Sequence, residues 1–242
     1  MSRRHPRQTR RVQASGSFKP TNLSGAVLWL RADLGITIAT GVSAWADQSG
    51  NGNNATQATG ANQPLFVASS TMNGRPSVRF NGVAQVLSTT TGATTTDHTI
   101  IVAGKWVALP AAQKAFIDFG DGAAAGNGSS IGALNVGNNN WYGYAGYGLP
   151  TGVAFNTNAH VWSKTYTSTG PLTSGFYDRT ADGTDNVRTY AAGTAVISVG
   201  ANPGSAVFAN FEMTEVVIYS RVLSAAERNS VENYMKSRYG TP

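Results

Sequence analysis

The sequence predicts an all-β fold in one body, an antiparallel sandwich closed by a single C-terminal helix. Gly, Thr, Ala, Ser and Asn dominate the 242 residues, and only 12% of them are charged. This bias suits short strands joined by tight turns better than a helical bundle. About ten to fourteen β-type segments are separated by turn signals at regular intervals, which is the pattern of an antiparallel sandwich. A body of this length can bury a full-sized core.

The strands are expected throughout the first 210 residues. In chain order they are Ala26–Arg31, Val42–Ala46, Ser77–Phe80, Gln85–Ser88, Thr99–Leu109, Lys114–Phe119, His160–Thr167, Gly175–Thr180, Val187–Tyr190 and Ala195–Gly200. Lys114–Phe119 is expected to pair with Thr99–Leu109, its neighbour in the chain. A glycine-rich loop follows at Gly120–Gly128.

The segment that begins at Phe211 is predicted to be the central strand. It is apolar on both faces near its end, as strands inside a layered structure are. Alternation places Phe211, Met213, Val217 and Tyr219 on one face, and Val216 and Ile218 on the other.

A helix is predicted directly after this strand, at about Ala225–Tyr239. Ser224 and Glu227 have the spacing of a capping box, in which each side chain satisfies a free backbone N–H at the helix start. Gly240 supplies the stop signal. The apolar face consists of Val231, Tyr234, Met235 and Tyr239, so we expect the helix to pack against the sheet and close it.

Residues 1–22 are predicted to be an extended basic N-terminal arm in front of the sandwich at 23–242. They show no apolar periodicity and cannot bury enough surface to order themselves. The arm contains no acid and six bases: Arg3, Arg4, Arg7, Arg10, Arg11 and Lys19. The other twelve bases are matched by twelve acids, so the net charge of +6 belongs to the arm and the body is neutral.

We expect this arm to anchor the protein to a partner. Arginines make bidentate contacts with carboxylate or phosphate groups. Nucleic-acid binding is disfavoured, because the body lacks the basic surface that normally accompanies it. An acidic groove of a protein lattice, or a neighbouring copy of the chain, fits better. A solvated, disordered tail is the alternative.

Composition also limits the cellular setting. No run approaches the roughly 20 apolar residues of a membrane helix, and the charged N-terminus lacks the apolar stretch of a secretory signal. There is no cysteine, so neither disulfides nor thiolate chemistry is available. We therefore expect synthesis in a cytoplasm and no membrane partner.

Four motifs, in this order, resemble one family: Leu28–Asp33, Trp45–Asn53, Asn73–Gly82 and Glu215–Gly240. Over residues 23–240 the chain resembles the laminin-G-like domains of the concanavalin A-like lectin/glucanase class. It is most similar to the branch found in bacteriophage virion and bacterial surface proteins. The resemblance implies a jelly-roll sandwich whose terminal strand and helix pack on the sheet that carries the first strand. Because the class includes carbohydrate binders, adhesion modules and virion modules, function has to be argued from sites.

Catalysis by paired carboxylates is not expected. A retaining glycosidase needs two carboxyls about 5–5.5 Å apart on one side of the sugar. The nearest pair is Glu212 and Glu215, and residues three apart in a regular strand point to opposite faces. The three histidines are scattered, and no Ser-His-Asp arrangement is readable. The sequence therefore predicts a non-enzymatic protein without catalytic residues and without a required cofactor.

The loop from Asp47 to Asn53 is a secondary candidate for a metal site. Asp47, Asn51 and Asn53 offer oxygens of the kind that Ca²⁺ binds. Their spacing is not that of an EF-hand, and the same residues serve equally as turn formers. The favoured interpretation is that Asp47 caps backbone N–H groups.

An aromatic segment is the candidate glycan-binding site. It contains Trp141, Tyr142, Tyr144 and Tyr147, with glycines at 143, 146 and 148. Flat aromatic faces bind the C–H faces of sugars, and the glycines favour an exposed loop. The favoured interpretation, by about two to one, is that these rings belong to the sandwich core, because large aromatic side chains are mostly buried.

Together these features predict a structural protein of a bacteriophage virion. The sandwich would decorate or cement a capsid surface, in preference to a tail. Its arm would lie in the lattice of the major capsid protein or another virion protein, and its outward loops could contact host surface glycans. The second hypothesis is a carbohydrate-binding module of a tail or surface adhesin.

Overall fold

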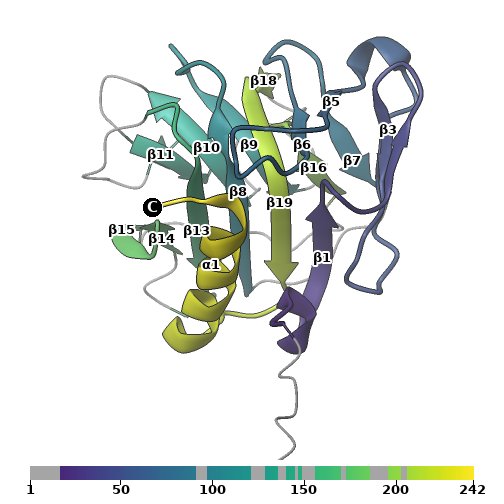
Figure 1. The fold of residues 1–242 in the computed structure, drawn as a ribbon. Helices are drawn as coiled ribbons and strands as arrows, with labels where there is room; N and C mark the ends of the chain where they lie inside the picture. The colour runs from purple at the N-terminus through teal and green to yellow at the C-terminus, as the bar shows by residue number, and fades with distance from the viewer. Residues whose placement is uncertain are drawn as a thin grey trace, which may run out of the picture.

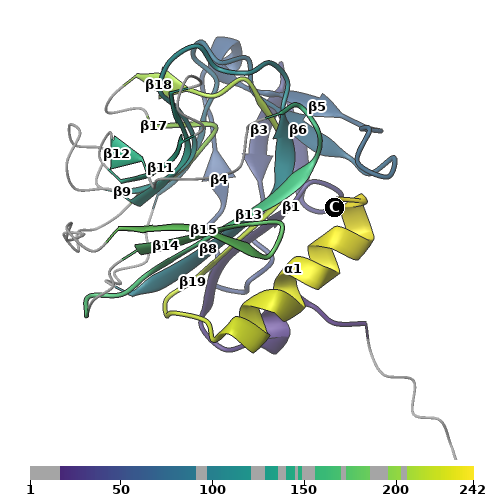
Figure 2. The ribbon, with the colours of Figure 1, turned by 90° about the vertical axis from the view of Figure 1, so that its left-hand side faces the viewer.

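The structure is a computed structural model that describes residues 17–90, 97–120, 129–135, 140–144, 147–148, 156–169, 173–185, 196–202 and 206–242. Within these ranges the chain forms two stacked β-sheets and one α-helix (Figure 1). Seen from the side, the helix lies against the outer face of one sheet (Figure 2). The predicted all-β sandwich with one C-terminal helix is confirmed.

Among the described residues, the first sheet has eight strands, and all their pairings are antiparallel. Its spatial order is β15-β14-β13-β8-β19-β6-β5, and β1 also pairs with β19. The strands are β1 (Ala26–Arg31), β5 (Leu65–Val67), β6 (Ser77–Arg79), β8 (His98–Trp106), β13 (His160–Tyr166), β14 (Thr173–Tyr177), β15 (Thr180–Asp185) and β19 (Phe211–Tyr219).

In the part of the chain that the structure describes, the second sheet has eleven strands, in the order β12-β11-β10-β9-β16-β7-β4-β3-β2, with β17 and β18 joined beside β9. Two 3₁₀ turns, η1 (Pro20–Asn22) and η2 (Gly60–Asn62), complete the regular elements before the helix. The strands are β2 (Ile36–Ile38), β3 (Val42–Trp45), β4 (Ala55–Thr56), β7 (Leu87–Thr89), β9 (Lys114–Gly120), β10 (Ser129–Asn135), β11 (Asn140–Tyr144), β12 (Tyr147–Gly148), β16 (Val196–Val199), β17 (Ala201–Asn202) and β18 (Val207–Phe208).

One predicted pairing is wrong. β9 does not pair with β8: it lies in the second sheet between β10 and β16, while β8 lies in the first sheet between β13 and β19. β8 is buried along almost its whole length, so it belongs in the middle of a sheet with a long partner on each side. The predicted strand at Val187–Tyr190 and the loop after Gly120 lie outside the described residues.

The core between the sheets is organised around stacked aromatic rings. Phe116 of β9 stacks on Phe211 of β19, with ring centroids 4.1 Å apart. Trp106 and Trp162 meet Phe211 edge-on at 5.2 and 5.3 Å. These four side chains are at most 1% exposed, so they lock the two sheets together.

The helix α1 (Ala225–Tyr239) has the predicted ends. Ser224 accepts from the backbone N–H of Glu227, and the Glu227 side chain accepts from the backbone N–H of Ser224, which confirms the capping box. Gly240 ends the helix in the left-handed region, with φ at 68°. Within the described ranges, no helix has the length and apolar character needed to span a membrane.

Candidate functional site

The outer face of β19, beneath α1, carries two carboxylates that the sequence places on opposite faces. Against β8, Met213 pairs with Gly104 while Glu215 pairs with Ala103, so the register slips at Thr214. This β-bulge reverses the alternation that a regular strand would keep. Glu212 and Glu215 therefore both point to the outer face, and the premise of the sequence argument is wrong.

The neighbours on each side show this reversal. Phe211 and Met213, and then Val216 and Ile218, belong to the core between the sheets. By contrast, Val217 and Tyr219 belong to the cluster under the helix. Strict alternation in the sequence placed Phe211, Met213, Val217 and Tyr219 on one face. Because of the bulge, the first two instead lie between the sheets and the last two lie under the helix.

Glu212 lies near the start of the strand, where β19 pairs with β6. Its Oε1 accepts from Ser77 Oγ at 2.8 Å, and its Oε2 accepts from Arg79 Nη2 at 2.7 Å. The carboxylate is buried, whereas the Arg79 side chain is 40% exposed. Glu212 is thus held in a hydrogen-bonded ion pair at the surface end of the sheet.

Glu215 lies beyond the bulge, where β19 pairs with β1, and is fully buried. Trp29 Nε1 donates to its Oε1 at 2.5 Å, and Tyr239 Oη donates to its Oε2 at 2.5 Å. Tyr234 Oη lies 3.4 Å from the same Oε2. Strands β1 and β19 and helix α1 together enclose this carboxyl group.

Burial raises the pKa of Glu215 from its ordinary 4.5 to about 7, and the hydrogen bonds from Tyr239 and Trp29 oppose this rise only in part. The nearby charges of Arg31 and Arg238 act in the same lowering direction. A carboxyl group that titrates near neutrality can serve as a general acid or base. In this structure, however, the Tyr234 ring stands between it and the surface.

Beside Glu215, an Arg–Asp–Arg bridge ties β1 to the end of α1. Asp33 accepts from Arg31 Nε at 2.7 Å and also from Arg238 Nη2. Although burial opposes it, these two arginines lower the pKa of Asp33. The local charge is therefore positive on balance once Glu215 is protonated.

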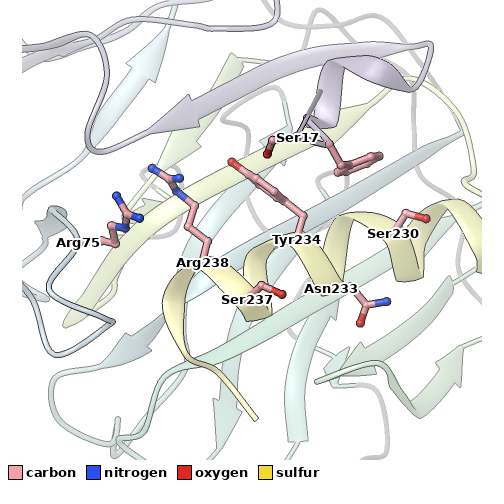
Figure 3. Close-up of a pocket in the computed structure, with 8 residues that line it drawn as sticks. Ser17, Arg75, Ser230, Asn233, Tyr234, Ser237 and Arg238 are labelled. Carbon is pink, nitrogen blue, oxygen red and sulfur yellow. The ribbon is translucent and has the colours of Figure 1, made fainter. Parts of the chain in front are cut away.

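An open groove of about 530 Å³ lies directly above these groups. Figure 3 shows Arg75 and Arg238 at one end, Tyr234 in the middle, and Ser230 and Asn233 at the other end. The groove is lined by Ser17, Phe18, Arg75, Ser230, Asn233, Tyr234, Ser237 and Arg238. It combines two aromatic rings with hydroxyl, amide and guanidinium groups, which is the mixture expected of a small-molecule site.

The end of the N-terminal arm forms one wall of this groove. The Phe18 ring lies 6.0 Å from the Tyr234 ring at an angle of 60°, and Tyr219 Oη donates to the Pro20 carbonyl at 3.0 Å. Lys19 is exposed at the start of η1, where its backbone N–H donates to Asn22 Oδ1. The other predicted anchoring residues, Arg3, Arg4, Arg7, Arg10 and Arg11, lie outside the described residues.

The aromatic segment belongs to the second sheet, whereas the groove lies beside α1 on the outer face of the first sheet. Trp141, Tyr142 and Tyr144 are on β11 and Tyr147 is on β12, at the edge of the second sheet. Their side chains lie outside the described part of the chain.

The Asp47 carboxylate has the capping role that the sequence favoured. It accepts from the backbone N–H groups of Trp29, Ser49 and Asn53, and from Ser49 Oγ, at 2.7–3.1 Å. Asn51 and Asn53 donate to backbone carbonyls of β1. Among the described residues, no group of three or more His, Asp or Glu side chains is placed to hold a metal ion.

Sequence reasoning missed a second polar cluster, which lies inside the sandwich. Asp118 of β9 accepts from Ser130 Oγ and from Asn202 Nδ2, while Lys164 Nζ donates to the Ser130 carbonyl at 3.3 Å. All four residues are at most 6% exposed. The sequence signal that could have indicated this cluster is Lys164, a lone lysine between Trp162 and Tyr166 on a strand with alternating side chains.

Solved structures of other proteins share this architecture. No family model and no curated protein matches the sequence. Trypanosoma rangeli sialidase with the inhibitor DANA is similar in structure, with a TM-score of 0.60, 16% identity, and coverage of 86% of this chain and 32% of that chain. Domain 4 of a GH43 extracellular arabinanase from Geobacillus stearothermophilus, in complex with arabinotriose, has a TM-score of 0.59, 12% identity and coverage of 87% and 98%. A GH54 α-L-arabinofuranosidase has a TM-score of 0.54, 16% identity and coverage of 82% and 51%.

These neighbours correct the prediction of a non-enzymatic protein. Each of them is a glycoside hydrolase or a domain of one, so the exclusion of an enzyme is contradicted. At these identities the likeness shows the fold alone, and the chain spans about a third of the length of the sialidases that it matches. The architecture is one that occurs in carbohydrate-active proteins.

Proposed function

We propose that this chain is a glycan-binding domain of the laminin-G-like type, and that its binding site is the groove between α1, Phe18 and Arg75. The observation that carries the proposal is the chemistry of the groove. Tyr234 and Phe18 offer aromatic faces for sugar C–H groups, and Ser230, Asn233 and Ser237 offer hydrogen-bonding groups along the same helix. A saccharide needs both kinds of contact, because its ring has apolar faces and a polar rim.

The fold comparison supports the same proposal. The arabinanase domain is matched over 98% of its own length, and its structure holds arabinotriose. A sandwich of this size can therefore bind an oligosaccharide as a separate domain. The sialidase match covers only about a third of that enzyme, so the same architecture also forms part of a larger carbohydrate-active protein.

Direct binding measurements test the proposal. We expect at least one member of a panel of arabinan, pectic, sialylated and bacterial surface oligosaccharides to bind the protein in calorimetric titration. Tyr234→Ala should weaken that binding about tenfold or more, since an aromatic contact contributes about 0.5–1.5 kcal/mol beyond its buried area. Gln57→Ala, directly after β4 of the second sheet and outside the groove lining, is the control. Unchanged affinity in a folded Tyr234→Ala protein would reject this groove as the site.

The same titrations decide between the groove and the aromatic segment. If Trp141→Ala removes binding while Tyr234→Ala does not, the glycan site belongs to the edge of the second sheet. We expect the opposite pattern, because the groove is a formed cavity with both aromatic and polar walls.

We also propose, as a second role, that the protein is displayed on a bacteriophage virion through its basic arm. The favouring observation is how the arm is attached: Phe18 contacts Tyr234, and Tyr219 binds the Pro20 carbonyl. The described end of the arm, residues 17–22, is therefore fixed beside the groove. A virion protein anchored in this way could present its glycan site to a host surface, so the two roles are compatible.

A further inference from the structure

The positive charge of the groove is concentrated at one end, and this position of the charge limits which class of sugar the groove can bind. Arg75 and Arg238 reach it from two separate elements, the loop before β6 and the last turn of α1, and lie at the same end (Figure 3). Asn73 Nδ2 donates to the Arg238 carbonyl at 3.2 Å, so this loop is held against the end of the helix. Two guanidinium groups are thus positioned together.

The two arginines are not equivalent. Arg238 is bound to Asp33 and donates from Nε to Tyr239 Oη at 3.1 Å. Arg75 is exposed, and within the described ranges its guanidinium has no hydrogen-bonding or ionic partner. One arginine is therefore fixed by the protein, while the other keeps all five of its donors for a ligand.

Because the described acids near this end are few, an anion placed here would be favoured. Asp33 is shared between Arg31 and Arg238, and Glu215 is sealed beneath Tyr234 and Tyr239. A planar carboxylate matches the donor fork of arginine in bidentate geometry. A neutral sugar would leave the Arg75 fork bound only to water.

The rest of the groove fits the hydroxyl groups of a sugar ring. Arg179 Nη1 donates to Asn233 Oδ1 at 2.8 Å, which turns the amide so that its NH₂ group remains as a donor. Ser17, Ser230 and Ser237 are exposed along the groove. Ser230 and Asn233 lie at the end away from Arg75 and Arg238, with the Tyr234 ring between the two ends (Figure 3).

We propose that the groove selects acidic saccharides, with the sugar carboxylate bound at Arg75 and Arg238 and the ring lying on Tyr234. This inference rests on the proposed glycan-binding function and adds the substrate class. The carboxylate class includes uronic acids and other carboxylated sugars, which share the planar group that the two arginines would hold.

The test compares two ligands that differ only at C6 of each ring: trigalacturonic acid, which carries carboxylates there, and the neutral trisaccharide in which they are reduced to hydroxymethyl groups. Calorimetric titration of the full chain should show the acid binding about ten- to a hundredfold more tightly, as expected for charge-assisted hydrogen bonds. Arg75→Ala should remove most of that preference, because only Arg238 remains, and should weaken binding of the acid much more than binding of the neutral trisaccharide. Arg75→Lys should restore only part of it, because lysine keeps the charge and loses the fork.

Lys114→Ala on β9 removes the same single charge on the other sheet and should change neither affinity. Equal affinity for the two trisaccharides, or an acid preference that Arg75→Ala leaves undiminished, overturns the inference. If both bind equally and depend on Tyr234, the glycan-binding function stands and only the acid selectivity is wrong. If neither binds, the selectivity is wrong, and the wider oligosaccharide panel decides the proposed function.

Discussion

Glu215 is a buried carboxyl group whose protonation should govern the stability of this protein. Its pKa is raised to about 7 by burial, whereas the unfolded chain would show the ordinary 4.5. The folded state therefore holds the proton more tightly, so the stabilisation is complete below pH 4.5 and is lost as the pH rises through 7. We expect stability to fall by about 3 kcal/mol across this window because of Glu215. Urea unfolding of wild type and Glu215→Gln at pH 5 and pH 8 measures it: the variant should lack this fall.

Glu227→Gln is the matched control for that experiment. The hydrogen bond from Arg221 lowers the pKa of Glu227 from its ordinary 4.5 to about 2, so its contribution is lost as the pH falls from about 4.5 to about 2. This variant should keep the wild-type dependence between pH 5 and pH 8. If Glu215→Gln also keeps it, the carboxyl group is not the source.

At this scale, the position of Glu215 could not be predicted from the sequence. Strict alternation was the right rule for a regular strand, but the bulge at Thr214 shifts every later side chain to the other face. Thr214 Oγ1 donates to the Ala103 carbonyl, and its own carbonyl accepts from Ala32. Those partners come from β8 and from beyond β1, and no local pattern around Thr214 specifies them.

The helix α1 contributes to stability through packing more than through its intrinsic propensity. Val231, Met235 and Tyr239 are at most 2% exposed and contact the outer face of the sheet. Met235→Ala should cost about 2–5 kcal/mol, because it leaves a cavity in this cluster. Ser237→Ala, on the exposed side of the same turn, should stay within about 0.5 kcal/mol. Equal melting midpoints for the two variants would mean that the helix is not docked.

The capping box makes a smaller and separate contribution. Ser224→Ala removes the acceptor for the Glu227 backbone N–H and should cost about 1 kcal/mol. Ser230→Ala is a suitable control, since its hydroxyl donates only to the Ala226 carbonyl within the helix. Thermal unfolding should therefore rank the variants as Met235→Ala, Ser224→Ala and Ser230→Ala, from least to most stable.

At the scale of elements, local signals were sufficient where structure is local. The helix ends at 224 and 240 follow from side-chain caps and a glycine, and both are as predicted. The pairing of β8 with β13 and β19 depends on contacts between residues far apart in the chain. Neighbouring strands pair often but not always, and here β8 and β9 enter different sheets.

For the whole molecule, composition and turn spacing were enough to predict the sandwich, because many short strands in a neutral body have few other ways to bury a core. The candidate binding site was harder to predict from the sequence than the fold. The groove brings together Phe18, Arg75 and α1 from three distant parts of the chain, and no motif in the sequence marks that meeting point. The structural neighbours, at 12–17% identity, show how far sequences can diverge within one architecture.

The virion role makes a prediction about the basic arm. Deleting residues 2–16 removes five of its six bases but keeps Phe18 and Pro20, which contact the body. We expect a folded sandwich that no longer joins undecorated capsids. Attachment of the full chain should weaken as salt rises, since the screening length falls to about 3 Å at 1 M. Co-sedimentation with capsids across a salt series is the measurement.

Two full-length variants separate charge from geometry in that attachment. Replacing the five arginines by lysine keeps the charge and loses bidentate contacts, whereas replacing them by glutamine loses both. We expect the lysine variant to bind with reduced affinity and the same dependence on salt, and the glutamine variant to match the deletion. Each exposed ion pair contributes under about 1 kcal/mol, so attachment must come from several pairs acting together. If the truncated body sediments as well as the full chain, a face of the sandwich provides the contact and the arm is a solvated tail.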